Sequence, residues 1–280
     1  MRIIAFLEAI LIPFARYFPK KTSIIMAKVQ DIIAPIEAIA PKELQESYDN
    51  VGLQCGGMQQ EVSRVLTCID ITEAVVDEAI AQGCQMIVSH HPLIFRGVKN
   101  LVPEQSYIHR TLVKAIKNDI ALYCAHTNLD NAAGGVNYKM AEVLGMTDVE
   151  PMSEGGVIGN LDKSLSPIEF IKTVKEKFQA ERVCSNLGEY INKEIRRVAL
   201  CGGSGAEFIA DAEALHADAF LTGEIKYHDY FDHANLLLVE AGHYETEQYT
   251  KELLHDIITK QLPEVEVIIS EVRTNPRYII

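Results

Sequence analysis

The feature that most constrains the fold is an alternation of strand-like apolar runs with helical segments. The run "VSRVLTCID" is followed by the helical pattern "TEAVVDEAIAQG", and "CQMIVSHH" is followed by "EQSYIHRTLVKAIKND". Thr72 and Gly83 stand where an N-cap and a C-terminal glycine would bound the first of these helices. Such alternation predicts an α/β architecture with substantially parallel sheets. In that class, active groups gather at the carboxyl ends of the strands.

The same pattern continues through the second half of the chain. "SPIEFIKTVKEKFQA" predicts a helix capped by Ser166, with Pro167 at its first position. The runs "RRVALCGGSG", "DAFLTGEI", "NLLLVEAGH" and "VEVIISEV" predict strands. The glycine-rich stretch "MSEGGVIGNLDKSLS" between the two halves is interpreted as a loop.

Composition narrows the classes of function. The 280 residues carry a formal net charge of -13, and this disfavours general binding to the phosphate backbone of nucleic acids. The cysteines form no C-x-x-C pair and lie in apolar, strand-like surroundings. They are predicted to be buried free thiols of a reducing cytosol, which favours a cytoplasmic location. They are Cys55, Cys68, Cys84, Cys124, Cys184 and Cys201.

Residues 1–25 are interpreted as an N-terminal extension that is dispensable for folding. Their apolar run carries Glu8, is too short to span a bilayer and lacks a small-residue cleavage site. A signal peptide is the alternative interpretation. The segment "MAKVQDIIAPIEAIAPKEL", which begins at Met26, itself resembles the start of a protein, so no membrane association is expected.

Metal-competent side chains recur where three predicted strands end. They are His90 and His91, then His126 and Asp130, and finally His243 and Glu247. The last two are four residues apart and share one face if the segment opens a helix. Any one of these residues alone is better explained as a cap or a packing residue. Their recurrence at three strand ends predicts a shared site.

Two adjacent histidines inside a strand would point to opposite faces. At a strand end followed by Pro92 the backbone can turn, and the two imidazoles could serve two neighbouring metals. Carboxylates are suited to bridge such a pair, and Asp130 and Glu247 are the candidates. Nitrogen and carboxylate ligands suit zinc, manganese, iron or cobalt. An Asx turn at Asp130 and a helix-dipole partner at Glu247 are the structural alternatives.

Two further motifs carry open alternatives. "CGGSGAEF" follows a strand and opens a helix, so it could cradle an anion or simply form a tight turn. His228 follows another predicted strand and is a candidate acid/base group supported by Glu224, or a capping residue.

Several motifs, in this order, resemble the NIF-three-like family, known as GTP cyclohydrolase 1 type 2 homologues. They are "YDNVGLQCG", "SHHPLIF", "AHTNLDNAAGGVN", "CGGSG", "TGEIKYHD" and "GHYETE". The resemblance extends from Met26 to Ile280. Tyr48 stands where the family often has tryptophan, and Val157 stands where it often has a basic residue.

The resemblance implies two α/β domains and a dinuclear metal centre. The metal-binding domain would be discontinuous, made of residues 26–130 and 236–280, with residues 131–235 inserted as the second domain. The implied metal ligands are His90, His91, Asp130, His243 and Glu247, with His126 as a further ligand or a neighbour. The family's subunits assemble into a ring-like homohexamer, so the chain itself is the expected partner.

The predicted function is therefore a dinuclear divalent-metal-dependent hydrolase, in which metal-activated water attacks a nucleotide-like small molecule. His126 and His228 are the predicted catalytic groups for proton transfer. The alternative is a metal-binding regulatory or interaction protein with little or no turnover.

Overall fold

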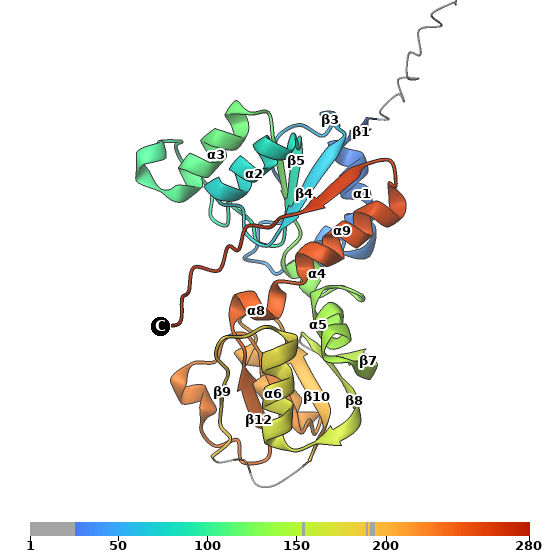
Figure 1. Cartoon of the computed structure of the whole chain (residues 1–280), viewed down its shortest axis with the longest axis vertical. Coiled ribbons are helices and arrows are strands. Elements are labelled where there is room, and N and C mark those ends of the chain that lie inside the picture. Colours follow the sequence, from blue (N-terminus) through green and yellow to red (C-terminus); the bar gives the residue numbers. More distant parts are fainter. Residues whose placement is uncertain (1–25, 153–154, 189, 191–193) are drawn as a thin grey trace, which may run out of the picture.

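The computed structural model describes residues 26–152, 155–188, 190 and 194–280 and shows two lobes stacked along the long axis (Figure 1). The predictions for residues 1–25 lie outside the described residues. No helix in the described ranges is long and apolar enough to cross a membrane. All six cysteines are free thiols, as predicted, and four of them are buried.

The first lobe is built on a five-stranded sheet in the order β13-β4-β5-β6-β2. The strands are β2 (Gly52–Cys55), β4 (Arg64–Cys68), β5 (Met86–Ser89), β6 (Ala121–Cys124) and β13 (Glu266–Ile269). All neighbours are parallel except β2, which pairs antiparallel with β6 at the edge. The predicted α/β class with parallel strands is thereby confirmed for this lobe.

Helices cover both faces of this sheet, which explains why its strands read as continuous apolar runs. One face packs against α1 (Val29–Ile39) and α9 (Thr250–Gln261). The other packs against α2 (Glu73–Gln82) and α3 (Tyr107–Lys117). A small antiparallel pair, β1 (Ala27–Lys28) and β3 (Glu61–Val62), borders the lobe.

The second lobe holds a six-stranded mixed sheet in the order β7-β8-β10-β11-β12-β9. The strands are β7 (Met146–Pro151), β8 (Val157–Leu165), β9 (Cys184–Ser185), β10 (Ile195–Cys201), β11 (Ala219–Thr222) and β12 (Leu237–Glu240). Helices α5 (Val136–Leu144) and α6 (Pro167–Lys177) pack on one face, and α7 (Ile209–Ala214) packs on the other. Short 3₁₀ helices lie at η1 (Lys42–Leu44), η2 (Pro103–Gln105), η3 (Ala206–Phe208) and η4 (Tyr227–Tyr230).

The predicted helix boundaries hold where a local cap defines them. The Thr72 hydroxyl accepts a hydrogen bond from the Val75 amide, and Gly83 ends α2 in the left-handed region with φ 68°. Ser166 and Glu169 form a capping box at the start of α6. These ends depend on contacts within a few residues, so local sequence specifies them.

Two predictions about the second lobe are wrong. The stretch 152–166 is not a loop, because most of it forms β8, which pairs with both β7 and β10. Gly159 fits there because a Cβ would lie 2.8 Å from the Thr147 carbonyl oxygen of the neighbouring strand. The boundary at residue 236 assigned β12 to the metal-binding domain, but β12 pairs in parallel with β11 of the second-lobe sheet.

Two short helices lie between the sheets, where both sets of strands end (Figure 1). Helix α4 (Thr127–Asp130) follows β6 of the first lobe, and α8 (His243–Glu247) follows β12 of the second. Because each helix begins within a few residues of a strand end, their side chains meet in the region between the lobes.

Candidate metal centre

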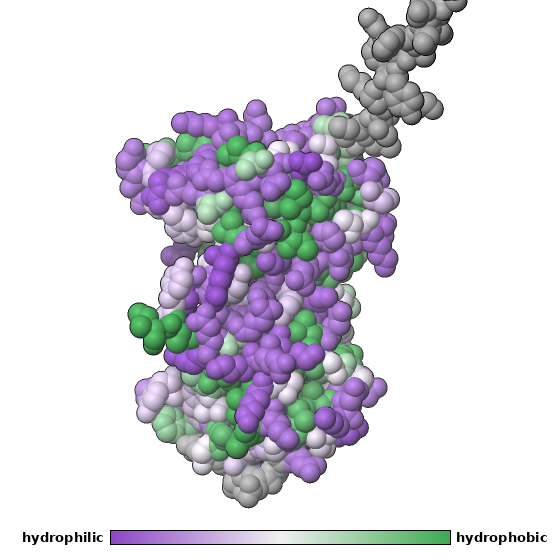
Figure 2. All heavy atoms as spheres, in the orientation of Figure 1, coloured by the Kyte–Doolittle hydropathy of each residue, from purple (hydrophilic) through white to green (hydrophobic). Residues whose placement is uncertain are grey.

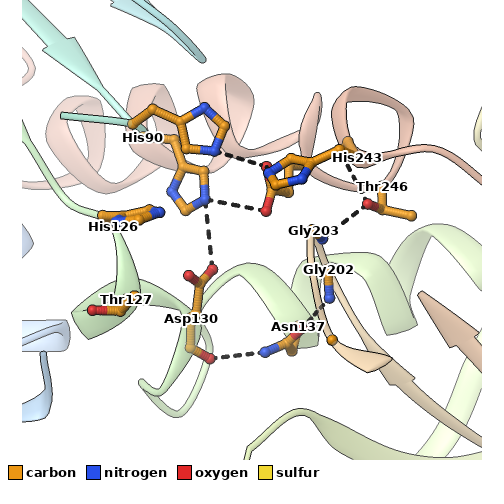
Figure 3. A network of polar contacts seen from close by, with 12 residues as sticks. His90, His126, Thr127, Asp130, Asn137, Gly202, Gly203, His243 and Thr246 are labelled. Atoms are coloured by element: carbon orange, nitrogen blue, oxygen red, sulfur yellow. Dashed lines mark hydrogen bonds and ion pairs between the residues drawn. The ribbon is translucent and has the colours of Figure 1, made fainter. Parts of the chain in front are cut away.

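The candidate site forms where β5, β6 and β12 end, and Figure 3 shows its side chains pointing toward one another. His90 and His91 directly follow β5, and their amides still donate to the carbonyls of Cys68 and Ile69. Gly242 adopts φ 103° between β12 and α8, a turn in which glycine is favoured. These backbone restraints bring side chains from distant parts of the sequence to one place.

Four imidazole rings cluster at this place. The His91 ring centroid lies 4.8 Å from that of His90, 5.3 Å from that of His126 and 5.4 Å from that of His243. Two groups of potential ligand atoms share His91. One comprises His90, His91 and His126, and the other comprises His91, His243 and Glu247. His91 is therefore central to the cluster.

The Nδ1 atoms of the two adjacent histidines are already engaged. His90 Nδ1 lies 3.0 Å from the Ala125 carbonyl oxygen, and His91 Nδ1 lies 2.8 Å from Asp70 Oδ1. An acceptor at Nδ1 favours the tautomer with its proton there and leaves the Nε2 lone pair free. Both Nε2 atoms are thus prepared to bind a cation.

The other two histidines, His126 and His243, also have an acceptor next to Nδ1, in both cases a carboxylate. His126 Nδ1 lies 2.9 Å from both carboxylate oxygens of Asp49. His243 Nδ1 lies 3.4 Å from Glu224 Oε2. A carboxylate behind the imidazole fixes the orientation of the ring and increases the basicity of the opposite nitrogen. Such carboxylates are typical of histidines that bind metals.

Two carboxylates face the free nitrogens. Glu247 Oε2 lies 3.0 Å from His91 Nε2 and 3.2 Å from His243 Nε2, while its Oε1 lies 3.7 Å from His90 Nε2. Asp130 Oδ1 lies 3.6 Å from His90 Nε2. Glu247 and the His90 ring are almost completely buried. The arrangement places two acids against the same set of imidazoles.

Two buried atoms of the cluster lack a hydrogen-bond partner among the described residues. They are His90 Nε2 and Glu247 Oε2. Glu247 Oε2 is close to two imidazole nitrogens, yet none of these contacts has hydrogen-bond geometry. Unpaired buried polar atoms are costly unless something else satisfies them. Imidazole nitrogen and carboxylate oxygen are ligands of divalent transition metals, so the residues present fit a metal ion.

The titration behaviour agrees with this interpretation. Burial raises the pKa of Asp130. Burial alone would also raise the pKa of Glu247, but the neighbouring imidazoles, led by His91, hold it well below its usual range. Burial alone would lower the pKa of His91, but Glu247 and Asp70 raise it well above its usual value. Positive charge on the imidazoles thus holds Glu247 as a carboxylate, and a cation at the same place would supply such charge.

A turn of the second lobe closes one side of the site. Gly203 has φ 60°, and a Cβ there would lie 2.2 Å from Glu247 Oε1. Its amide donates to Thr246 Oγ1, and the Gly202 amide donates to Asn137 Oδ1 (Figure 3). The Asn137 amide group donates in turn to the Asp130 carbonyl. Since side chains use these amides, "CGGSG" is a tight turn and not an anion cradle.

The structure brings six of the seven predicted site residues together. They are His90, His91, His126, Asp130, His243 and Glu247. His228 lies exposed on η4, where its ring contacts Tyr227 and Phe231. Glu224 faces His243 and not His228.

Two carboxylates of the site were not predicted. Asp70 follows β4 and contacts His91, and Asp49 from "YDNVGLQCG" contacts His126. Asp70 ends an apolar run in the same way as His91, and that position was a usable signal. Asp49 follows no strand, so only the folded chain reveals its partner.

Comparisons with known proteins agree with this picture. Residues 27–276 match the family model described as Duf34/NIF3 (NGG1p interacting factor 3). A GTP cyclohydrolase 1 type 2 homolog from Clostridium perfringens is 34% identical over 89% of this chain and 98% of its own. A GTP cyclohydrolase 1 type 2 homolog from Lactococcus lactis is 34% identical over 90% of this chain and 100% of its own.

Solved structures share the fold. A Staphylococcus aureus hypothetical protein superposes with a TM-score of 0.82 at 28% identity, covering 90% of this chain and 99% of its own. A Bacillus cereus protein related to NIF3 gives a TM-score of 0.83 at 24% identity, covering 91% and 99%, and is evidence for the fold alone.

Proposed function

The chain belongs to the Duf34/NIF3 family, and we propose that it is a dinuclear divalent-metal-dependent hydrolase acting on a nucleotide-like substrate. The observation that carries this proposal is that two buried atoms, His90 Nε2 and Glu247 Oε2, have no hydrogen-bond partner among the described residues although they lie inside a cluster of four imidazoles. The names of the relatives, GTP cyclohydrolase 1 type 2 homolog, support the substrate class.

We assign two cations to the cluster because the two oxygens of Glu247 face different imidazoles, Oε1 that of His90 and Oε2 those of His91 and His243. Glu247, with each oxygen facing different imidazoles, is suited to bridge the two positions, and Asp130 also faces His90 Nε2. The proposed ligands are His90, His91, Asp130, His243 and Glu247. A pair of divalent cations would acidify a water molecule and stabilise charge in the transition state.

The remaining groups of the site position ligands or move protons. Asp70 and Glu224 hold the rings of His91 and His243 from behind. His126 is fixed on Asp49 through Nδ1 and is partly exposed, so its Nε2 can exchange a proton with a bound substrate. We assign proton transfer to His126 before His228, because His228 contacts Tyr227 and Phe231 on an exposed turn.

We also propose that the chain works in the cytoplasm as a ring-like homohexamer. The free thiols support a reducing compartment. Figure 2 shows a largely hydrophilic face with a hydrophobic projection at the C-terminal end, where Ile279 and Ile280 are exposed. Exposed apolar ends of this kind favour contact with another subunit. Light scattering of the purified protein tests the assembly, and a monomer at micromolar concentration would contradict it.

The decisive experiment combines metal content with turnover. Purified protein loaded with manganese, zinc or iron is screened against GTP and phosphoesters, and the metal is quantified by elemental analysis. We expect about two metal ions per chain and turnover that Asp130→Ala abolishes without unfolding the protein. The control is Asp77→Asn, on an exposed face of α2 paired with Lys114. Protein that holds its metals but turns over nothing would favour a metal-binding regulatory protein instead.

A further inference from the structure

Two exposed aromatic rings stand beside the histidine cluster. Tyr48 is 62% exposed and Phe95 is 41% exposed, and their ring centroids are 6.3 Å apart. The Phe95 ring also lies 6.3 Å from the His126 ring, at an interplanar angle of 80°. Aromatic side chains of this size gain much from burial. Here their faces stay open next to the candidate reaction centre.

The segments that carry the two rings are tied together by a closed set of hydrogen bonds. Asn50 Nδ2 donates to the Ile94 carbonyl at 2.5 Å, and the Ile94 amide donates to Gln54 Oε1 at 3.0 Å. Gln54 Nε2 completes the set by donating to the Asn50 carbonyl at 2.7 Å. The backbones next to Tyr48 and Phe95 are therefore held relative to each other, and the ring pair has a defined place.

The same loop also anchors the histidine. Asp49, between Tyr48 and Asn50, accepts from His126 Nδ1 and from the Thr127 amide. Burial raises the pKa of the Tyr48 hydroxyl, and the charges of Glu46, Glu207, Asp49 and, least of all, Asp130 add to this rise. The exposed rings thus belong to the structure that builds the metal site.

A cavity of about 690 Å³ opens from Tyr48 toward the second lobe, and Phe95 lies outside its lining. Lys226 and Arg277 border it together with four carboxylates, Glu207, Glu224, Asp229 and Glu240, and Arg277 is paired with Glu224 at 2.5 Å. Glu224 and Arg277 also border a neighbouring cavity of about 570 Å³ that reaches the candidate ligands. Cavities of this size accommodate small-molecule ligands.

From this arrangement, and resting on the proposed function, we propose that Tyr48 and Phe95 form a stacking platform for a planar heteroaromatic ring of the substrate. Because the two ring planes are tilted by 56°, a flat ring stacked on one of them would meet the other at an angle, next to His126. The polar remainder of the molecule would occupy the cavity bordered by Tyr48 and Lys226. Stacking on aromatic side chains tolerates different bases because every base has a π-face. An aliphatic sugar phosphate has no such face and gains nothing from the platform.

Calorimetric titration of the metal-loaded, assembled protein tests the platform. Guanosine 5′-monophosphate and ribose 5-phosphate are the probes, since both contain ribose 5-phosphate and only the nucleotide carries the guanine base. We expect the wild type to bind the nucleotide more tightly. Tyr48→Ala and Phe95→Ala should each weaken nucleotide binding about tenfold and leave ribose 5-phosphate binding unchanged. Tyr48→Phe should retain the affinity. Ile168→Ala is the control, because Ile168 on α6 is 55% exposed and outside both cavities.

Three outcomes would overturn the platform. The first is that the wild type binds neither probe, or binds both with equal affinity. The second is that both alanine variants bind the nucleotide as tightly as the wild type does. The third is that Tyr48→Ala changes the mass of the assembly, which would assign the rings to a subunit contact. Circular dichroism verifies that each variant is folded. If binding depends on the base but nothing is turned over, the proposed hydrolase activity is contradicted and the stacking platform is retained. If substrates are turned over with no preference for the base, the hydrolase activity is retained and the platform is contradicted.

Discussion

His91 Nε2 lies 3.0 Å from Glu247 Oε2, although the two residues follow strands of different sheets. This contact joins the two lobes at the candidate metal centre. His91 approaches from the end of β5, and Glu247 approaches from α8 after β12. The site can therefore form only when both sheets are folded and packed against each other.

Replacing His91 should reduce the metal content, because its Nε2 faces Glu247, the proposed bridging carboxylate, and lies among both groups of candidate ligand atoms. For His91→Ala we expect the metal content to fall to less than half that of the wild type. Elemental analysis after extensive dialysis is the measurement. His109→Ala is the control, since the half-buried His109 ring contacts only the Val102 carbonyl among its described hydrogen bonds. Equal metal content in both variants would contradict the ligand assignment.

Asp70 should tune the site without being a ligand. In Asp70→Asn the side chain keeps its size but loses the charge that holds His91 Nδ1 at 2.8 Å. We expect metal affinity to fall about 10- to 100-fold, the range found when such outer carboxylates are changed. Competition with a chelator of known affinity measures the loss. The control variant Asp77→Asn, which alters the exposed carboxylate paired with Lys114, should have no effect on metal affinity.

Gly203 should tolerate no side chain. A Cβ there would lie 2.2 Å from Glu247 Oε1, and φ 60° is unfavourable for other residues. We expect Gly203→Ala to displace Glu247, reduce metal binding and destabilise the protein by about 1–3 kcal/mol. Thermal unfolding and elemental analysis measure both effects. Gly57→Ala is the matched control, because a Cβ at Gly57 meets no atom within 4 Å. Wild-type behaviour of Gly203→Ala would show that this turn does not constrain the site.

Thiol reactivity should separate the cysteines by burial. Burial raises the pKa of the Cys84 thiol to about 11, so little of the reactive thiolate exists at pH 8. Its reaction should accelerate as the pH rises toward 11. In the native protein at pH 8 we expect a thiol reagent to modify only the two half-buried cysteines, Cys55 and Cys184. All six should react in denaturant, and mass spectrometry of labelled peptides distinguishes the sites. Rapid native labelling of Cys84 would contradict this order.

Local features of the fold were predictable because their causes are local. The cap of α2 at Thr72 and the capping box of α6 at Ser166 each depend on contacts spanning three residues. The parallel sheet of the first lobe could be predicted from the sequence because strands buried on both faces are continuously apolar. The strand β8 was missed because Gly159, together with Gly155 and Gly156 just before the strand, resembles a loop until a neighbouring strand lies against it.

The candidate ligands could be recognised in the chain because each belongs to a short motif at a strand end. His243 and Glu247 are four residues apart in one helix, and this spacing sets their common face. Local sequence was thus enough to predict most of the element types, most caps and the identity of the metal-competent side chains. Hydrogen bonding and side-chain periodicity within a few residues are enough to specify them.

Only the tertiary structure decided which of these groups meet. It assigned Asp70 to His91, Asp49 to His126 and Glu224 to His243, and it left His228 on an exposed turn. It also placed β12 in the second-lobe sheet. These contacts depend on the register of paired strands and on the packing of one lobe against the other. Both arise from interactions between residues far apart in the chain, and no short motif encodes them.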